Sequence, residues 1–491
     1  MDETAAVQSR RTLEGAKGAL LMGGSGFARR AGLLVLCVAG AVHGLALGAV
    51  RVRTGSLETY AFRSLDSWEY YNLALNIEKN GTFSQRSAPP YEPDTWRTPG
   101  YPLFLVMLIS ILGAGATRLV IAQHVIAALS AWLLFQVARP HLGGRRAMVA
   151  SLLFLLEPYH LYYAFWLMSE TLFVALLLLA WYAWDRAHAG QGSAWYALTG
   201  LLTGMLVLVR PVALLLPATL VITTIILSLR TSVPAAGRLS GLVRGPLVFA
   251  LTCGLTVGNW MARNRIVADH FALSSQGGVV LAYFKATEVE LWRTGQAANR
   301  YLETSLDPAH LEDPHPVWES IDTQLRDRLS YLPAEQRDQL RWPNLAQGNR
   351  TSVDSFEISR ALGSIGWSAI AGHPSAAISC SAVRCGELLA FPLSLAVTWH
   401  AGISVNRVRA GAIGAAYALL SIACAARLLR GRATLRSIGF PMACAFALLL
   451  MTTPQLDPRL RLPLIPLMLV IALLSNRPAS GEAAQAGTDT Q

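Results

Sequence analysis

The chain has 491 residues, of which 53% are hydrophobic and only 14% are charged. Soluble domains carry about 25% charged residues, so this composition excludes an ordinary soluble protein and predicts an all-α polytopic membrane protein. The net charge of +11 would also suit a nucleic-acid partner. We expect no nucleic acid, because basic membrane proteins owe such charge to cytoplasmic loops rich in Lys and Arg.

The first membrane segment follows a polar cytoplasmic tail, residues 1–30, that contains several Arg and Lys. Ala31–Val50 is an apolar run with the length of one span, about 20 residues. Only Arg51-Val52-Arg53 follows it, with no small-residue cleavage site. We therefore predict an uncleaved signal anchor with its N-terminus inside, which puts the first outer loop, 51–118, outside.

Two apolar stretches come next, and only one of them can span. Tyr101–Gly113 is too short to cross a bilayer, whereas Leu119–Val137 is long enough. Counting only the second puts Arg139, Arg145 and Arg146 inside, where the positive-inside rule requires them. We therefore expect Tyr101–Gly113 to lie at the membrane interface.

The remaining spans then alternate across the membrane and bring the count to about ten. They are predicted at Ala147–Ala164, Thr171–Trp184, Trp195–Val209, Val212–Leu229, Gly245–Met261, Val408–Ala426, Ile438–Thr453 and Leu462–Leu474. The first seven spans and the first outer loop form a membrane domain over 31–261. The last three lie in 407–475, and 476–491 is a cytoplasmic tail. With this topology the cytoplasmic segments hold an excess of Lys and Arg over Asp and Glu, as expected.

The outer stretch 262–406 is too long for a simple connector. Its middle, roughly 290–360, is charged and contains Asp313-Pro314-His315-Pro316. We expect a small, mostly helical extracytoplasmic domain there, followed by an interfacial helix within Ala376–His400. The six cysteines of the chain show no zinc or thioredoxin-like spacing. We expect free thiols at Cys380 and Cys385, and a disulfide between them only in an oxidising compartment.

The topology gathers charged side chains on the outer face, at span ends or in outer loops. They are Asp66, Arg97, Glu170, Arg210, Arg263, Asp457, Arg459 and Arg461. Singly, each has a structural explanation, because an acid can cap a helix start and an arginine can extend its head to lipid headgroups. Together they favour a polar cavity at membrane depth, where charges usually mark a site.

Guanidinium groups bind phosphate bidentately and keep their charge, so arginines at an outer membrane surface suit a phosphate on a lipid carrier. A well-placed carboxylate suits a general base that deprotonates an acceptor hydroxyl. Asp66 precedes a predicted interfacial helix, Ser67–Asn80, which would fix its position. Attack from the opposite face would invert the sugar configuration, and arginine would stabilise the departing phosphate. Aromatic residues crowd the outer turn before Glu170, mostly as an interfacial belt, and a minority of them, such as Tyr163, could stack on a sugar.

These residues resemble a known class, the GT-C integral-membrane glycosyltransferases. The resemblance covers about residues 31–475, and it is strongest to the bacterial branches related to protein O-mannosyltransferases and to the lipid A aminoarabinose transferase. The motifs that carry it are Asp66-x-x-x-Tyr70-Tyr71, Arg97-x-Pro99-Gly100-Tyr101-Pro102-Leu103-Phe104, Leu167-Met168-Ser169-Glu170-Thr171-Leu172-Phe173, Arg210-Pro211, Arg263-Asn264, Ser274-Ser275-Gln276-Gly277-Gly278 and Arg459-Leu460-Arg461-Leu462-Pro463-Leu464-Ile465-Pro466.

The resemblance implies a hexosyl- or pentosyltransferase of the bacterial cytoplasmic membrane, with a polyprenyl-phosphate sugar donor, inverting transfer and an extracytoplasmic active site. Asp66 matches the catalytic aspartate of the first loop and Glu170 the acid of the second. The positions expected to bind the donor phosphate are Arg97, Arg263 and, in the last loop, Arg459 or Arg461, between which the sequence does not decide. The expected substrate pocket comprises Tyr70, Tyr71, Tyr101, Tyr163 and Arg210.

Protein mannosyltransferases carry Asp-Glu in the first loop, whereas Ser67 follows Asp66 here. This departure leaves a divalent metal open, and it leaves the acceptor open among lipid, glycan and protein. Two other functions share parts of the pattern: a transporter or flippase for lipid-linked solutes, and a polymerase or ligase of lipid-linked glycans. Transporters usually show internal repeats and broken helices at the midplane, and the sequence shows neither, so the transferase is favoured.

Overall fold

The computed structural model describes residues 25–229, 235–295, 316–345, 353–390, 407–429, 435–452 and 458–474. Within these ranges every regular element is a helix and no β-strand occurs, which confirms the predicted all-α class. The helices long and apolar enough to cross a membrane are Gly26–Thr54, Ala116–Leu142, Pro211–Leu229 and Val243–Ala268. Shorter apolar helices are Gly100–Leu112, Ser193–Val209, Ala415–Leu429, Ile438–Met451 and Leu464–Leu473. The chain is a multi-pass membrane protein, and the count of about ten spans stays a prediction.

The helices up to the end of the seventh predicted span are α2 (Ser25–Thr54), α3 (Glu58–Ala61), α4 (Leu65–Asn80), α5 (Gly100–Leu112), α6 (Ala116–Leu142), α7 (Gly144–Leu155), α8 (Pro158–Tyr163), α9 (Glu170–His188), α10 (Ser193–Val209), the 3₁₀-helix η1 (Pro211–Ala213), α11 (Leu216–Leu229) and α12 (Ala235–Ala268). They are followed by α13 (Gln276–Val279), the π-helix η2 (Val280–Ala286), α14 (Thr287–Arg293), α16 (Pro316–Arg328), α17 (Ala334–Asp338), α18 (Trp342–Leu345), α19 (Ser355–Gly372), α20 (Pro374–Ala390), α22 (Arg407–Leu429), α23 (Leu435–Thr452), α24 (Pro458–Arg461) and α25 (Leu464–Leu473).

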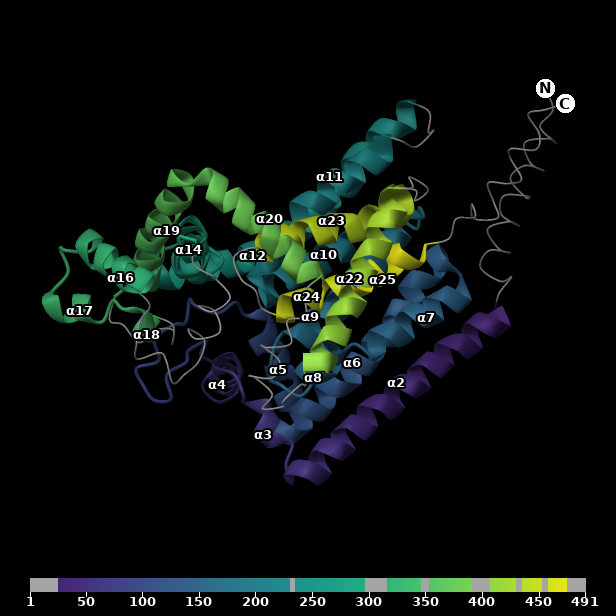
Figure 1. Cartoon of the computed structure of the whole chain (residues 1–491), viewed down its shortest axis with the longest axis horizontal. Helices are drawn as coiled ribbons and strands as arrows, with labels where there is room; N and C mark the ends of the chain where they lie inside the picture. The colour runs from purple at the N-terminus through teal and green to yellow at the C-terminus, as the bar shows by residue number, and fades with distance from the viewer. Residues whose placement is uncertain are drawn as a thin grey trace.

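Helix α9 lies at the centre of the helical bundle. It packs against α6 and α10, while α2 packs against α6 and α7 along one side of the molecule (Figure 1). Phe173, Trp181 and Trp184 of α9 are almost completely buried. A helix that is apolar all round is buried by its neighbours, and α9 meets this condition over most of its length.

The predicted span Ala147–Ala164 is interrupted in the structure. Helix α7 ends at Leu155, and α8 starts at Pro158 with Glu157 as its N-cap. The Glu157 carboxylate accepts a hydrogen bond from the backbone N–H of His160 at 2.6 Å. A Glu-Pro pair suits a helix start, because Pro lacks the N–H that a first turn leaves unpaired. Helix α7 alone is about 18 Å long, against about 30 Å of hydrocarbon.

The outer stretch forms a second hydrophobic cluster. Its core contains Tyr283, Trp318, Leu325, Trp342 and Leu362, from η2 and helices α16, α18 and α19. The Trp318 and Trp342 rings lie 4.4 Å apart between centroids. Figure 1 shows these helices at one end of the molecule, away from α2. The described part of this stretch is helical, as expected. Residues 296–315 and 346–352 lie outside the described residues, and the domain boundaries stay predictions.

The Ser-Ser-Gln-Gly-Gly motif fastens the outer helices to the first outer loop. Ser275 donates its backbone N–H to the Thr95 carbonyl at 2.9 Å. Gly278 donates to the Ser359 hydroxyl at 3.1 Å, and a Cβ at Gly278 would stand 1.8 Å from the Ser359 carbonyl oxygen. Only glycine permits such an approach of backbone to backbone.

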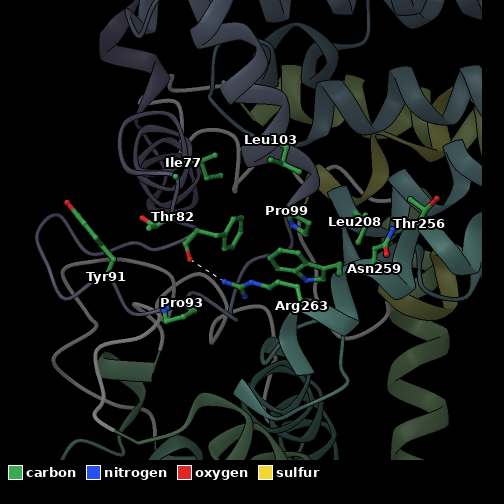
Figure 2. A pocket seen from close by; sticks show the side chains of 13 residues that line it. Ile77, Thr82, Tyr91, Pro93, Pro99, Leu103, Leu208, Thr256, Asn259 and Arg263 are labelled. Carbon is green, nitrogen blue, oxygen red and sulfur yellow. Dashed lines mark hydrogen bonds between the residues drawn. The ribbon is translucent and has the colours of Figure 1, made fainter. Parts of the chain in front are cut away.

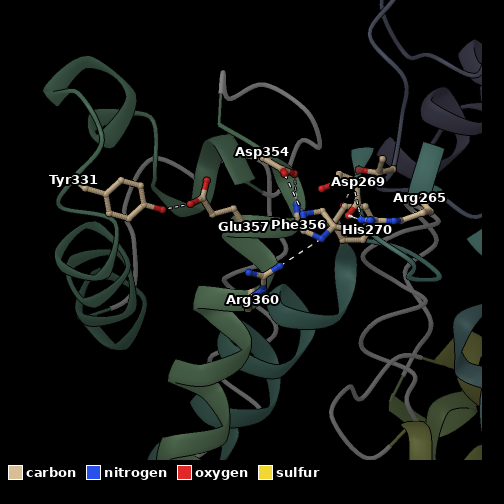
Figure 3. A network of polar contacts seen from close by, with 10 residues as sticks. Arg265, Asp269, His270, Tyr331, Asp354, Phe356, Glu357 and Arg360 are labelled. Atoms are coloured by element: carbon tan, nitrogen blue, oxygen red, sulfur yellow. Dashed lines mark hydrogen bonds and ion pairs between the residues drawn. The ribbon is translucent and has the colours of Figure 1, made fainter. Parts of the chain in front are cut away.

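A polar network ties the end of α12 to α19 at the surface. Figure 3 shows His270 between Asp354 and Arg360, with its ring nitrogens 3.3 Å from the Asp354 carboxylate and 3.4 Å from the Arg360 guanidinium. Arg265 pairs with Asp269 beside it at 2.5 Å. These exposed contacts are expected to contribute little each.

Candidate active site

Asp66 lies in the first turn of α4, one residue inside the helix rather than before it. The helix starts at Leu65, and the Ser64 hydroxyl accepts the Asp66 backbone N–H at 3.3 Å as an N-cap. The helix ends at Gly81, whose φ of 64° closes the last turn through the Ile77 carbonyl. Serine at the start and a left-handed glycine at the end are standard capping residues, and an acid in the first turn complements the helix dipole.

Asp94 holds Arg97 in position on the loop before α5. The Asp94 carboxylate accepts the Arg97 backbone N–H at 2.8 Å and the Gln85 side-chain amide at 2.6 Å. Asp94 is completely buried, and this burial raises its pKa above the ordinary value. The buried Asp94 carboxyl thus fixes the conformation of the loop through its hydrogen bonds to Arg97 and Gln85.

The Arg97 guanidinium joins two carboxylates of α4. Its Nη2 lies 2.5 Å from Asp66 Oδ1, and its Nε and Nη2 each lie 2.5 Å from Glu69 Oε2. The Asp66 side chain is 22% exposed, whereas those of Glu69 and Arg97 are each 11% exposed. Asp66 is therefore the member of this group most open to a substrate.

Burial raises the pKa of Glu69 to about 7, although the Arg97 guanidinium acts in the opposite direction. The neighbouring carboxylates of Asp66 and Asp94 also raise this pKa, because two further negative charges disfavour ionisation. The protonated form of Glu69 is therefore populated near neutral pH, whereas an ordinary glutamate is ionised there.

Tyr70 and Tyr101 form the wall behind this group. The Arg97 guanidinium lies 5.0 Å from the centre of the Tyr70 ring, and the Tyr70 and Tyr101 rings meet edge to face at 4.9 Å. The Tyr101 hydroxyl donates to Gln123 at 2.7 Å, and Gln123 in turn donates to the Trp166 carbonyl at 2.5 Å. This chain of hydrogen bonds connects α5, α6 and the turn before α9.

Glu170 and Arg210 form a buried ion pair within electrostatic reach of Tyr70. Glu170 Oε1 pairs with Arg210 Nη1; the Glu170 side chain has no exposed surface and that of Arg210 is 12% exposed. Both charges act on Tyr70, so the pair lies within electrostatic reach of the Asp66 group. The structure brings Glu170 and Arg210 into the same region as Asp66, Arg97, Tyr70 and Tyr101, but seals Glu170 from solvent.

Arg263 reaches the same loop from α12. Its Nη1 donates to the Asp94 carbonyl at 2.7 Å and to the Asn264 side chain at 2.9 Å. The guanidinium also lies 4.8 Å from the centre of the Trp260 ring. Asp94 therefore connects two arginines, with its carboxylate on the Arg97 backbone and its carbonyl on Arg263.

A pocket of about 590 Å³ lies beside Arg263, between the end of α4, the first outer loop, α5, α10 and α12. Figure 2 shows Arg263 extending from α12 toward the segment that carries Thr82. The lining is mostly apolar and comprises Ile77, Gly81, Thr82, Phe83, Tyr91, Pro93, Pro99, Leu103, Leu208, Thr256, Asn259, Trp260 and Arg263. Arg263 is its one formally charged lining residue, at the end next to Asp94.

Arg461 belongs to a different cluster. It is 1% exposed, donates its Nε to the Leu388 carbonyl, and lies 4.2 Å from the centre of the Tyr417 ring. The Tyr417 hydroxyl donates to Glu157. The side chain of Arg459, the neighbouring candidate, lies outside the described residues.

Two further residues expected in the substrate pocket contact other parts of the protein. The Tyr71 hydroxyl donates to the Ala114 carbonyl at 2.6 Å, which connects α4 to the segment between α5 and α6. Tyr163 is 6% exposed and packs edge to face against Trp166 at 5.9 Å. Through these contacts, both tyrosines help to pack neighbouring segments together.

Three residues of the site were not singled out from the sequence: Glu69, Asp94 and Gln123. Glu69 had a usable signal, because residues three apart share a helix face and Asp66 lies three residues before it. Asp94 also had one, since an Asp three residues before a chain reversal often accepts a local backbone N–H. Gln123 had none, because its partners lie on other helices.

Within the described residues, no group of three or more His, Cys, Asp or Glu is arranged to hold a metal ion. The cysteines Cys380 and Cys385 are both free thiols. The side chains that the structure brings together at the site are carboxylates, guanidinium groups and phenols.

The part of the chain around this site matches a known family. Residues 96–248 match the family model described as dolichyl-phosphate-mannose-protein mannosyltransferase. The match covers less than a third of the chain, and over that segment it agrees with the resemblance to glycosyltransferases related to protein O-mannosyltransferases. The matched segment contains Arg97, Glu170 and Arg210 of this site, while Asp66, Arg263 and Arg461 lie outside it.

Comparisons with whole proteins are more distant. No curated protein matches the chain. Among solved structures, the chain is similar to ArnT from Cupriavidus metallidurans bound to undecaprenyl phosphate, with 15% identity, a TM-score of 0.36 and coverage of 90% of this chain and 77% of that one. It is also similar to ArnT from Cupriavidus metallidurans in the apo state, with 15% identity, a TM-score of 0.37 and coverage of 92% and 79%. Neither structure supports a residue-by-residue comparison at this distance.

Proposed function

We propose that this GT-C-like protein is an inverting glycosyltransferase that moves a sugar from a polyprenyl-phosphate donor to a hydroxyl acceptor. The reaction takes place at the outer face of the bacterial cytoplasmic membrane, where the predicted topology puts the first outer loop. The observation that carries the proposal is the contact of the partly exposed Asp66 carboxylate with Arg97, on a loop that Asp94 connects to Arg263 and its apolar pocket.

Asp66 is the general base in this proposal. Its side chain is the most exposed of the three charged groups at Arg97, so an acceptor hydroxyl can approach it. The first turn of α4 holds the carboxylate near a positive helix end, and Arg97 lies on its other side, so the ionised form that a base requires is stabilised. The deprotonated hydroxyl attacks the anomeric carbon from the face opposite the phosphate, and the configuration inverts.

Arg97 and Arg263 bind the donor phosphate. The Nη1 of Arg97 donates no hydrogen bond to the described residues, which leaves that end of the guanidinium for a ligand oxygen. Arg263 stands at the polar end of a pocket with apolar walls, and such a combination suits an amphiphile with an anionic head and a hydrocarbon chain. As the glycosidic bond breaks, the phosphate gains charge, and guanidinium groups already in place stabilise it.

The other candidate residues act around this centre. Glu170 is sealed, so its role is to hold Arg210 behind Tyr70 and Tyr101 rather than to touch the acceptor. Arg461 is buried against the Leu388 carbonyl and the Tyr417 ring, and its expected contact with the donor phosphate stays a prediction.

The proposal is tested with Asp66→Asn in purified protein in lipid nanodiscs, supplied with membrane lipid extracts and a panel of polyprenyl-phosphate sugars. General bases contribute about 10²–10⁴-fold, so transfer should fall by that factor while the protein keeps its melting temperature. Glu92→Gln is the matched control, because Glu92 is an exposed carboxylate of the same loop, paired with Arg86. Turnover by Asp66→Asn within about tenfold of the wild type would remove Asp66 from the base role.

The side of the membrane is tested separately. A cysteine placed at Glu92 should react in intact cells with a maleimide that does not cross membranes. Labelling only after the membrane is opened would put the first outer loop, and the proposed chemistry, in the cytoplasm.

A further inference from the structure

Three charged side chains meet at one point of the site, and their charges do not balance. Asp66 and Glu69 both bind the single guanidinium of Arg97, so the group has a net charge of −1 when both carboxylates are ionised. A donor phosphodiester would bring another negative charge to the same place. Arg263, the second arginine proposed for the phosphate, brings the sum of these charges only to zero. Protonation of one carboxylate would make the site positive, which favours an anion.

We propose that Glu69 is a positioning residue of the donor site, which binds the Nε edge of Arg97 and is protonated while the donor phosphate is bound. This inference rests on the proposed function, because it requires an anionic phosphodiester at Arg97. The proton comes from solvent and returns to it when the lipid phosphate leaves.

The geometry favours Glu69 over Asp66 as the protonated member. The whole Glu69 residue, backbone included, is 8% exposed, and it lies about one helical turn after Asp66 along α4. One of its oxygens, Oε2, receives both the Nε and the Nη2 contacts of Arg97, so its other oxygen is available for a proton. A protonated carboxyl still accepts hydrogen bonds through its carbonyl oxygen. Glu69 can therefore hold the guanidinium in place without cancelling its charge.

The groups around Glu69 act on its ionisation in opposite directions, and those that raise its pKa prevail. Asp66 on α4 and Asp94 on the loop before α5 both disfavour its ionisation, and Arg97 opposes them. The phenols of Tyr70 and Tyr101, from α4 and α5, are uncharged near neutral pH. Burial is the largest cause, and together these causes raise the pKa of Glu69 to about 7.

The consequence is a donor affinity that depends on pH. If only the form with protonated Glu69 binds, the apparent Kd rises with the fraction of the ionised form. For a pKa of about 7 the apparent Kd then increases about tenfold from pH 6 to pH 8. Asp66 remains ionised over this range and stays available as the base.

The test is a binding measurement with a short polyprenyl methyl phosphate diester. This probe has a single charge that does not titrate between pH 6 and pH 8, so any change in affinity comes from the protein. Binding to the full-length protein in detergent is measured by thermophoresis at both pH values, with the corresponding polyprenol as the uncharged control. The variants are Glu69→Gln, Glu69→Ala and the matched surface control Glu92→Gln.

The wild type and Glu92→Gln are expected to lose about tenfold in affinity from pH 6 to pH 8. Glu69→Gln keeps the acceptor oxygen for Arg97 Nε without the titration, so it should keep the pH 6 affinity at both values. Glu69→Ala removes the contact with Arg97 and should bind more weakly at both. Rescue by Gln but not Ala distinguishes positioning from a merely structural role.

Three results would overturn the inference. Wild-type affinity that is the same at pH 6 and pH 8, or a Glu69→Gln variant with the wild-type pH dependence, would show that Glu69 is not the titrating partner of Arg97, while the donor class would stand. Failure of every variant to prefer the phosphodiester over the polyprenol would overturn the proposed donor class itself, and this inference with it.

Discussion

Replacing Gly100 with alanine tests how closely Arg97 depends on the packing of α5 against α10. A Cβ at position 100 would stand 2.6 Å from the Val209 backbone nitrogen, 2.7 Å from the Leu208 carbonyl carbon and 2.7 Å from Val209 Cγ2. Two of these atoms belong to the backbone, so no rotamer change relieves the contact. Carbon and nitrogen atoms pack at about 3.5 Å, so the start of α5 must move by roughly 1 Å.

Such overpacking costs about 1–3 kcal/mol of stability. Arg97 lies three residues before Gly100, so the same shift displaces its guanidinium, and a misplacement of about 1 Å can lower a rate by about 10²-fold. The assay is the melting temperature and the transfer rate of Gly100→Ala in nanodiscs. Gly254→Ala is the matched control, because Gly254 is a helical glycine with no atom within 4 Å of its added Cβ.

The control should keep the wild-type rate and gain a little stability, since alanine favours a helix by about 0.5–1 kcal/mol over glycine. Gly100→Ala should lose both stability and rate. If the two variants melt and transfer alike, then the approach of α5 to α10 does not position Arg97, and the argument from packing is wrong.

The remaining predictions concern the buried charges. Arg210→Ala should destabilise the protein by about 3–5 kcal/mol in thermal denaturation, because it leaves Glu170 buried without its partner. The double variant Arg210→Ala/Glu170→Ala should recover part of this loss. If the single and double variants lose the same stability, the pairing is contradicted. The folded-state pKa of Glu69 is raised from 4.5 to about 7, so the stabilisation linked to its proton is present below pH 4.5 and is lost as the pH rises to 7. The stability of the wild type relative to Glu69→Gln should therefore fall by on the order of 3 kcal/mol between pH 4.5 and pH 8, and a difference that does not change with pH would refute the shift. Arg461→Ala should raise the donor KM by about tenfold and leave the acceptor KM within about twofold, as kinetics at varied donor and acceptor would show; an unchanged donor KM would remove Arg461 from the donor site.

The interactions of neighbouring residues allowed part of the fold around the site to be predicted from the sequence. The pattern of α4 was expected over Ser67–Asn80, and the structure extends it by two residues to Leu65, because Ser64 caps the first turn. Glu157-Pro158 is an equally local signal, and it explains why the expected span Ala147–Ala164 stops and restarts. Most of the other apolar runs are helical in the structure, because a helix pairs its backbone polar groups internally and the bilayer core offers them no partner.

The partners of the charged side chains could not be predicted from neighbouring residues. Arg97 and Asp66 are 31 residues apart, and Arg263 meets the Asp94 carbonyl across 169 residues. These pairs form because α4, the first outer loop and α12 pack together, and no periodicity encodes which arginine reaches which oxygen. The separate place of Arg461, with Tyr417 and Glu157, came to light only in the same way.

The sequence by itself determined the membrane class, the helical elements and the presence of acids and arginines in the loops expected outside. Composition, helix caps and apolar runs are properties of neighbouring residues, and they need no knowledge of the fold. Only the tertiary structure decided that Glu69 shares Arg97 with Asp66, and that Glu170 is sealed against Arg210. Burial and charge pairing arise when helices distant in sequence pack together. They determine which carboxylate remains exposed to solvent and which has a raised pKa.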